Sequence, residues 1–214
     1  MKEENVVRYY VLCNKLKDVI RTGWKNWNVK RDRLESVAEH IFGVQMLAIA
    51  MKSEYDYKDV DIMKVLYMLA VHELEEIYIG DLTLFQIADG KKKEFGHKAV
   101  KKVLGNLIDK DQIESLILEF DARKTKEPKF AYWCDKLECD LQSKIYDEEN
   151  CVDLSDQKDN PTFNDKRVQD LLKSGKSFSE MWLTFGQNSY NYDKNFTAVS
   201  NYALDNNILK FNYI

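Results

Sequence analysis

One histidine of this chain stands beside several carboxylates in an otherwise apolar stretch. His72 opens the segment HELEEIYIGD, where Glu73 follows directly and Glu76 comes four residues later. Residues four apart share a helix face, so His72 and Glu76 would point the same way, with Glu73 turned by about 100°. Because their side chains differ in length, all three can still converge on one point. Imidazole and carboxylate groups gathered in this way bind divalent metal ions or transfer protons.

Two more residues of the same types occur in apolar helical segments elsewhere in the chain. His40 directly follows Glu39, one turn into an expected helix, and Asp135 lies between Trp133 and Leu137. Buried carboxylates are normally paired or bound to metal, because an isolated charge in apolar surroundings is costly. Taken singly, a helical histidine is more often a core residue and an acidic run more often a solvated face. The combination in one small helical chain favours a site.

A site built from two imidazoles and two carboxylates offers mixed nitrogen and oxygen ligands. Such a set suits Zn, Mn, Fe, Co or Ni rather than metals that prefer thiolates. An ion of this kind can acidify a bound water molecule. The only other histidine, His97, is expected to be a surface or packing residue, so a two-metal site with four or more histidines cannot be built.

Four short motifs of the chain resemble the HD superfamily of metal-dependent phosphohydrolases. The motifs are ESVAEH (35–40), HELEEIYIGD (72–81), DKL (135–137) and, before them, RTGW (21–24). Their order and spacing are most similar to the branch of the bacterial 5′-deoxynucleotidases and their eukaryotic HD-domain relatives. The resemblance spans about residues 5 to 147 of the 214.

The resemblance implies a role for each of these motifs. Four residues correspond to the ligands of one divalent cation, with Mn, Co, Fe, Zn, Ni and Mg all left open: His40, His72, Glu73 and Asp135. Glu76 corresponds to the carboxylate that orients or deprotonates the attacking water. Asp81 corresponds to a catalytic-site residue that faces the substrate sugar. Arg21 would approach the phosphate and Trp24 the nucleoside.

Residue 73 departs from the family, because the His-Asp pair that names it is His72-Glu73 here. Glutamate keeps the charge and both oxygens but adds a methylene, so its carboxylate reaches further. We expect an active phosphohydrolase that releases phosphate from a small phosphomonoester, above all a (deoxy)nucleoside 5′-monophosphate. The alternative is a catalytically inactive HD-type domain that binds a nucleotide or a protein partner. A purely structural helical protein is disfavoured by the apolar surroundings of His72 and Asp135.

The segments between the motifs have the pattern of helices almost throughout. Ser36 and Glu39 form a capping box that starts one helix. A nearly all-apolar stretch from about residue 59, stopped by Gly80, predicts a buried central helix. Further helices are expected at 4–20, 94–108, 111–120, 129–147, 165–173, 177–188 and 195–205, with a loop at 21–33. The fold class is therefore all-α. A compact HD-type bundle (1–150) would carry a short helical extension (151–214) packed on the same body.

Composition narrows the class of protein further. The 32 basic and 36 acidic residues give a net charge of −4, without the basic footprint of nucleic-acid binding. Eight glycines and two prolines argue against an all-β or a disordered chain. No apolar run reaches the length of a membrane span, and the N-terminus lacks the apolar region of a signal peptide. We therefore expect a cytoplasmic protein. The resemblance implies a small-molecule nucleotide substrate, and a homodimer is left open.

Overall fold

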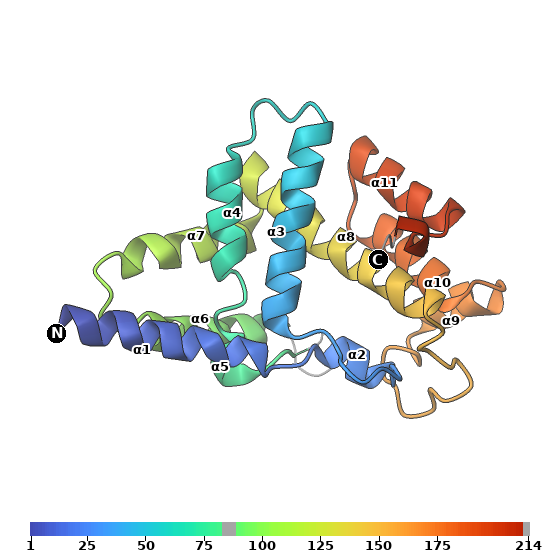
Figure 1. The fold of residues 1–214 in the computed structure, drawn as a ribbon, viewed down its shortest axis with the longest axis horizontal. Coiled ribbons are helices and arrows are strands. Elements are labelled where there is room, and N and C mark those ends of the chain that lie inside the picture. The colour runs from blue at the N-terminus through green and yellow to red at the C-terminus, as the bar shows by residue number, and fades with distance from the viewer. Residues whose placement is uncertain (83–88, 212–214) are drawn as a thin grey trace. The chain divides into compact units, whose positions relative to one another are not determined.

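The computed structural model describes residues 1–82 and 89–211, with side chains omitted at 89–93. Within these residues the regular elements are helices, and the expected all-α fold class is confirmed (Figure 1). The α-helices are α1 (Lys2–Asn14), α2 (Thr22–Asn26), α3 (Val37–Glu54), α4 (Ile62–Val71), α5 (Glu76–Ile79), α6 (Asp89–Leu104), α7 (Lys110–Ala122), α8 (Lys126–Glu148), α9 (Lys166–Lys173), α10 (Phe178–Ser189) and α11 (Lys194–Asp205), with 3₁₀ turns η1 (Lys15–Lys17) and η2 (Leu209–Phe211). A helix with the length and hydropathy to span a bilayer is not found among the described residues.

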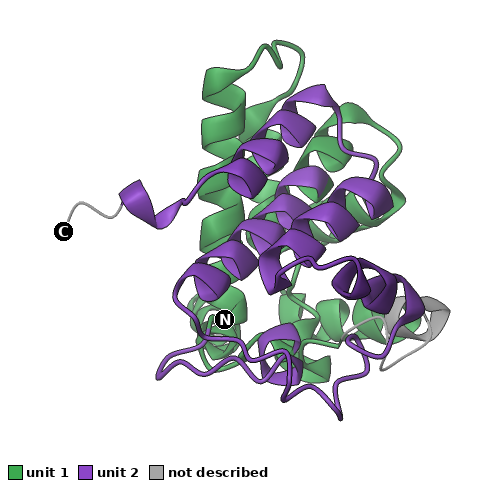
Figure 2. Ribbon diagram, turned by 90° about the vertical axis from the view of Figure 1, so that its right-hand side faces the viewer, with its two compact units in different colours: residues 1–22, 35–132 green, residues 23–34, 133–214 purple. Residues whose placement is uncertain are grey.

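The described chain divides into two compact units, which Figure 2 shows in different colours. Unit 1 comprises residues 1–22 and 35–132, and unit 2 comprises residues 23–34 and 133–214. Helix α8 begins in unit 1 and continues without interruption into unit 2. These bounds differ from the expected domain division at residue 150, which stays a prediction.

The first metal-site helix, α3, starts where the capping box predicted it. The Ser36 hydroxyl accepts the Glu39 N–H, and the Glu39 carboxylate accepts the Ser36 N–H at 2.8 Å. The buried face of α3 carries Val44, Ala48 and also His40. In Figure 1, α3 and α4 lie side by side in unit 1. Because His40 is spaced four residues before Val44, it lies on the same buried face of α3, in the interior of unit 1.

The prediction of one long central helix from about residue 59 to Gly80 is wrong, because the helix is interrupted between α4 and α5. Helix α4 ends at Val71, and the backbone then turns through residues 72–75 before α5. The bonds in this turn join residues three apart, such as the Glu76 N–H to the Glu73 carbonyl at 3.1 Å. The physical cause is local: the His72 imidazole bonds the Leu69 carbonyl at 2.7 Å at the end of α4. The stop at Gly80, where φ is +73°, is confirmed.

The other expected helices are present, with ends displaced by up to five residues, except that the first one gives way to η1 after Asn14. The loop expected at 21–33 contains the short helix α2. Its formation reflects tertiary packing, because Trp24 and Trp27, three residues apart, both enter the core of unit 2. Local sequence alone, with Gly23 at the start, gives little reason for a helix there.

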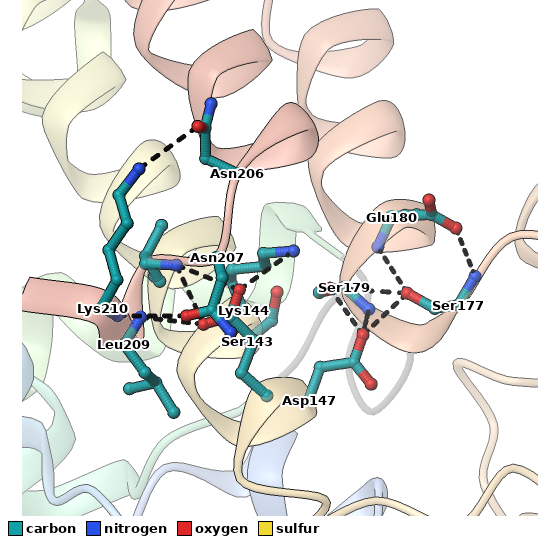
Figure 3. Close-up of polar contacts among 12 residues, drawn as sticks. Ser143, Lys144, Asp147, Ser177, Ser179, Glu180, Asn206, Asn207, Leu209 and Lys210 are labelled. Carbon is teal, nitrogen blue, oxygen red and sulfur yellow. Dashed lines mark hydrogen bonds and ion pairs between the residues drawn. The ribbon is translucent and has the colours of Figure 1, made fainter.

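In unit 2, one stretch of α8 holds both the start of α10 and the end of the described chain (Figure 3). The Asp147 carboxylate accepts the Ser179 N–H at 2.9 Å and the Ser177 hydroxyl at 2.7 Å. The carboxylate of the next residue, Glu148, accepts the N–H groups of Ile208 and Leu209 at about 3 Å. The start of α10 and the chain around η2 are therefore anchored to α8 by charge-assisted hydrogen bonds.

Deeper in unit 2, α8 presents a fully buried carboxyl group to α10. Asp140 accepts a hydrogen bond from the Tyr192 hydroxyl at 3.1 Å. Burial raises the pKa of the Asp140 carboxyl well above its ordinary value. On α10, Gly186 faces this carboxyl so closely that a methyl group in its place would overlap the carboxyl atoms.

Candidate metal centre

Unit 1 brings three of the predicted ligands together. His40, His72 and Glu73 each offer one ligand atom, and these atoms lie within 4.8 Å of one another. The Nε2 atoms of His40 and His72 are 3.8 Å and 3.5 Å from the same Glu73 oxygen, Oε1. Ligands that share an ion at 2.0–2.2 Å stand about 3.0–3.4 Å apart. A small inward movement would therefore let all three bind one ion.

The break after α4 is what turns His72 towards this cluster. Its Nδ1 lies 2.7 Å from the Leu69 carbonyl oxygen, which can only accept, so Nδ1 carries the proton. In the neutral ring the lone pair is then on Nε2, the atom that faces Glu73. Metal-bound histidines are characteristically oriented in this way by a carbonyl on the other ring nitrogen.

The chemistry of these three donors fits a divalent cation. Two buried imidazole nitrogens and one carboxylate oxygen converge, and such a set suits a transition metal. A lone pair on Nε2 of His72 aimed at a carboxylate oxygen is repulsive unless positive charge lies between them. A proton can supply that charge, and so can a metal ion, which would also draw in His40.

A predicted phosphate-binding residue lies beside the cluster. Arg21 Nη1 is 3.5 Å from Glu73 Oε1 and 3.8 Å from Asp81 Oδ1, with all three side chains largely buried. The Arg21 N–H donates to the Glu35 carbonyl at 3.0 Å, just before α3. The next N–H, of Thr22, donates to Asp81 Oδ2 at 2.5 Å. Asp81 therefore fixes the backbone that carries Arg21, a task that the sequence did not reveal.

The predicted catalytic carboxylate, Glu76, is the first residue of α5 and is only 2% exposed. It does not share a continuous helix with His72, because the turn at 72–75 separates them. The argument from helical spacing therefore does not place it. Its burial beside the turn that carries two metal-site residues still keeps it a candidate for the acid–base role, which stays a prediction.

The two remaining predicted residues belong to unit 2. Trp24 is 2% exposed and packs edge-on against Tyr146 and tilted against Trp182, with ring centroids 5.2 and 5.3 Å away. It is therefore a core residue of unit 2, and its contact with a nucleoside stays a prediction. Asp135 is buried on α8, with Lys136 Nζ 2.9 Å from its carboxylate.

Outside the cluster, the third histidine has a partner of its own. His97 Nε2 lies 2.9 Å from Asp121 Oδ2, and this pair joins α6 to α7 at a partly exposed position. Sequence reasoning missed one functional group in the cluster, the Leu69 carbonyl that orients His72. Backbone groups carry no signal in a sequence, so only the position of the helix end could have indicated it.

Comparison with known proteins agrees with the geometry. The HD domain family matches residues 13–191. The 5′-deoxynucleotidase HDDC2 of Dictyostelium discoideum is 31% identical over 152 residues, covering 68% of this chain and 79% of the relative. Its counterpart from Bos taurus is 27% identical over 147 residues, covering 67% and 69%. A crystal structure of a predicted metal-dependent phosphohydrolase from Magnetospirillum magnetotacticum MS-1 has the same fold, with TM-score 0.65, 22% identity and coverage of 95% and 91%.

The chain therefore belongs to the HD domain family. Within the HD superfamily it stands in the branch of the 5′-deoxynucleotidases, and it is a hydrolase of that family. The resemblance read from the four short motifs is thus confirmed.

Proposed function

We propose that this protein releases phosphate from (deoxy)nucleoside 5′-monophosphates, using one divalent cation. The observation that carries the proposal is the convergence of two imidazole nitrogens on one Glu73 oxygen in unit 1. The relatives that are named 5′-deoxynucleotidases support the substrate class. The proposed ligands are His40, His72, Glu73 and Asp135.

Asp135 is proposed as the fourth ligand on two grounds. Its carboxylate is 4% exposed, and a buried carboxylate needs a cationic partner, for which Lys136 is one candidate and a metal ion another. The second ground is the DKL motif of the HD superfamily, which Asp135 opens.

A bound divalent ion would acidify a water molecule and polarise the phosphoryl group. Glu76 takes the proton as the water oxygen attacks phosphorus, and the bond from phosphorus to the sugar oxygen breaks. The sugar oxygen leaves as an alkoxide and takes the proton from the Glu76 carboxyl, which gives the nucleoside hydroxyl and restores the carboxylate. Arg21 neutralises phosphate charge through its guanidinium, whose fork of N–H groups matches two phosphate oxygens. Asp81 holds the Arg21 backbone and faces the sugar.

The Glu73 side chain bears directly on the choice between an enzyme and an inactive domain. In a site that had lost metal binding, the longer Glu73 carboxylate would be free to turn away from the imidazoles. Instead, Glu73 Oε1 lies 3.5 Å from His72 Nε2. The extra methylene is therefore accommodated within the cluster, which favours the active variant over a domain that only binds a nucleotide or protein partner.

The test is a phosphate-release screen over ribo- and deoxynucleoside 5′-monophosphates, run with Mn, Co, Fe, Zn, Ni and Mg after treatment with a chelator. Metal content is measured on the same purified protein. We expect about one ion per chain and release that depends on it. Stoichiometric metal without release from any nucleotide would support the inactive alternative. Absence of binding by any of these ions would overturn the metal site.

Two further proposals concern the setting of the enzyme. We propose a cytoplasmic location and a homodimer whose contact is the apolar surface of the C-terminal helices. Sedimentation analysis across a concentration series would test the dimer, and fluorescent tagging of the full chain in cells would test the location. A monomer at all concentrations would overturn the homodimer.

A further inference from the structure

The Glu73 carboxylate has three nitrogen neighbours at one oxygen atom. Oε1 lies 3.5 Å from His72 Nε2, 3.8 Å from His40 Nε2 and 3.5 Å from Arg21 Nη1. Two of these neighbours are proposed metal ligands, whereas the third is a permanent cation. The oxygen that would bind the ion is therefore already the counter-ion of an arginine.

The length of the Glu73 side chain allows its carboxylate to contact both the two histidines and Arg21. An aspartate carboxylate in the same direction would end roughly 1.3 Å sooner. The contact with Arg21, now at 3.5 Å, would then lie beyond the ion-pair range of about 4 Å. The glutamate that distinguishes this chain from the His-Asp pattern thus brings the metal-site carboxylate within reach of the phosphate-binding residue.

Arg21 is held where it can serve either neighbour. Its own N–H is fixed to Glu35 and the next N–H to Asp81, so the backbone stays in place while the side chain pivots. Asp81 Oδ1, 3.8 Å from Nη1, retains one acidic contact for the guanidinium when it leaves Glu73. Like charges repel strongly at such distances in a largely buried site, so Arg21 and a divalent ion would oppose each other at Glu73.

We propose that Arg21 is the resident counter-cation of Glu73, that it competes with the divalent ion for this carboxylate, and that phosphate relieves the competition by drawing Arg21 away. The inference rests on the proposed metal site and deepens it. It couples metal and phosphate binding through one arginine. By reciprocity, phosphate then strengthens metal binding by the same factor as the metal strengthens phosphate binding.

The experiment is a titration of the metal-free protein with Mn²⁺ alone, in a buffer without phosphate, followed by electron paramagnetic resonance of free Mn²⁺. We expect Arg21→Gln to bind Mn²⁺ about tenfold more tightly than the wild type, since the positive charge that competes with the ion for Glu73 is removed. Arg21→Lys keeps the charge and should stay within about threefold of the wild type. The control is Lys98→Gln, which removes one positive charge from the exposed pair with Glu94 and should leave Mn²⁺ affinity unchanged.

A double-mutant cycle tests the role of side-chain length. In the Glu73→Asp background, Arg21→Gln should change Mn²⁺ affinity by less than about twofold, because the shorter carboxylate no longer meets the guanidinium. An undiminished tenfold effect in that background would show that Arg21 acts through something other than Glu73 and would overturn the inference.

Inorganic phosphate provides a second readout that does not depend on turnover. It should tighten Mn²⁺ binding by the wild type more than by Arg21→Gln, because only the wild type has an arginine to release. Equal tightening in both proteins, or Mn²⁺ binding by Arg21→Gln no tighter than by the wild type, would overturn the inference while leaving the proposed function intact. Failure of all variants to bind Mn²⁺, with circular dichroism confirming the fold, would overturn both.

Discussion

Replacing His72 by alanine separates the metal-binding role of this residue from its structural one. The imidazole is buried, bonds the Leu69 carbonyl at 2.7 Å and meets the Phe120 ring edge-on at 5.2 Å. Losing the hydrogen bond costs about 1–3 kcal/mol, and losing the ring contact adds roughly 0.5–1.5 kcal/mol. We therefore expect the metal-free variant to be less stable by about 2–4 kcal/mol. Urea denaturation in the presence of a chelator measures this difference.

The metal-binding role is measured on the same variant under conditions where it stays folded. Removing one of the proposed ligands should weaken Mn²⁺ binding at least about 100-fold, more than the change of an outer hydrogen-bond partner would. The matched control is His97→Ala, which removes an imidazole paired with Asp121 at a partly exposed position. We expect the control to keep the Mn²⁺ affinity of the wild type. A His72→Ala protein that is folded and binds Mn²⁺ within threefold of the wild type would refute the ligand assignment.

Three further predictions concern the carboxylates. Glu76→Gln should retain Mn²⁺ and lose about 10²–10⁴-fold in kcat, and loss of the metal would instead make Glu76 a ligand. Asp135→Ala should weaken Mn²⁺ binding as much as loss of a histidine ligand does; an unchanged titration curve would remove it from the site. Because burial raises the pKa of Asp140 well above its ordinary value, the folded protein binds more protons than the unfolded chain once the pH exceeds about 3.9. The contribution of Asp140 to stability should therefore fall as the pH rises from there towards the raised pKa, and the Asp140→Asn variant should lack this contribution. Urea denaturation from about pH 4 to about pH 7 measures both proteins, and an equally steep variant would contradict the assignment.

Most of the helices were predictable because they leave local signatures in the sequence. The Ser36 and Glu39 capping box marks the start of α3, and Gly80 marks the end of α5. The interruption of the helix at residues 72–75 was not predictable, because an apolar stretch without an internal glycine or proline predicts one continuous helix. What ends α4 is a side chain that bonds the backbone three residues earlier, and histidine has no strong preference for that position.

The site was predictable as a set of residue types, and its internal contacts were not. The ligand set followed from motif order, and the structure brings His40, His72 and Glu73 together. Arg21 lies near the same Glu73 oxygen as the two histidines because residues 20–22 lie beside residues 35–37. This is a tertiary contact, which the sequence pattern does not reveal. The motif that contains Trp24 did not indicate that this residue packs in the core of unit 2, and its contact with a nucleoside stays a prediction.

The close approach of Gly186 to Asp140 restricts the order in which these two positions can change. Any side chain at 186 meets the buried carboxyl, so a first substitution there is penalised while Asp140 remains. A smaller residue at 140 first opens a void, which a methyl group at 186 can then fill at least in part. Alanine at both positions should therefore be better tolerated than the separate effects predict. Among homologous sequences, a residue larger than glycine at position 186 should occur only together with a smaller residue at position 140, so that the two positions co-vary.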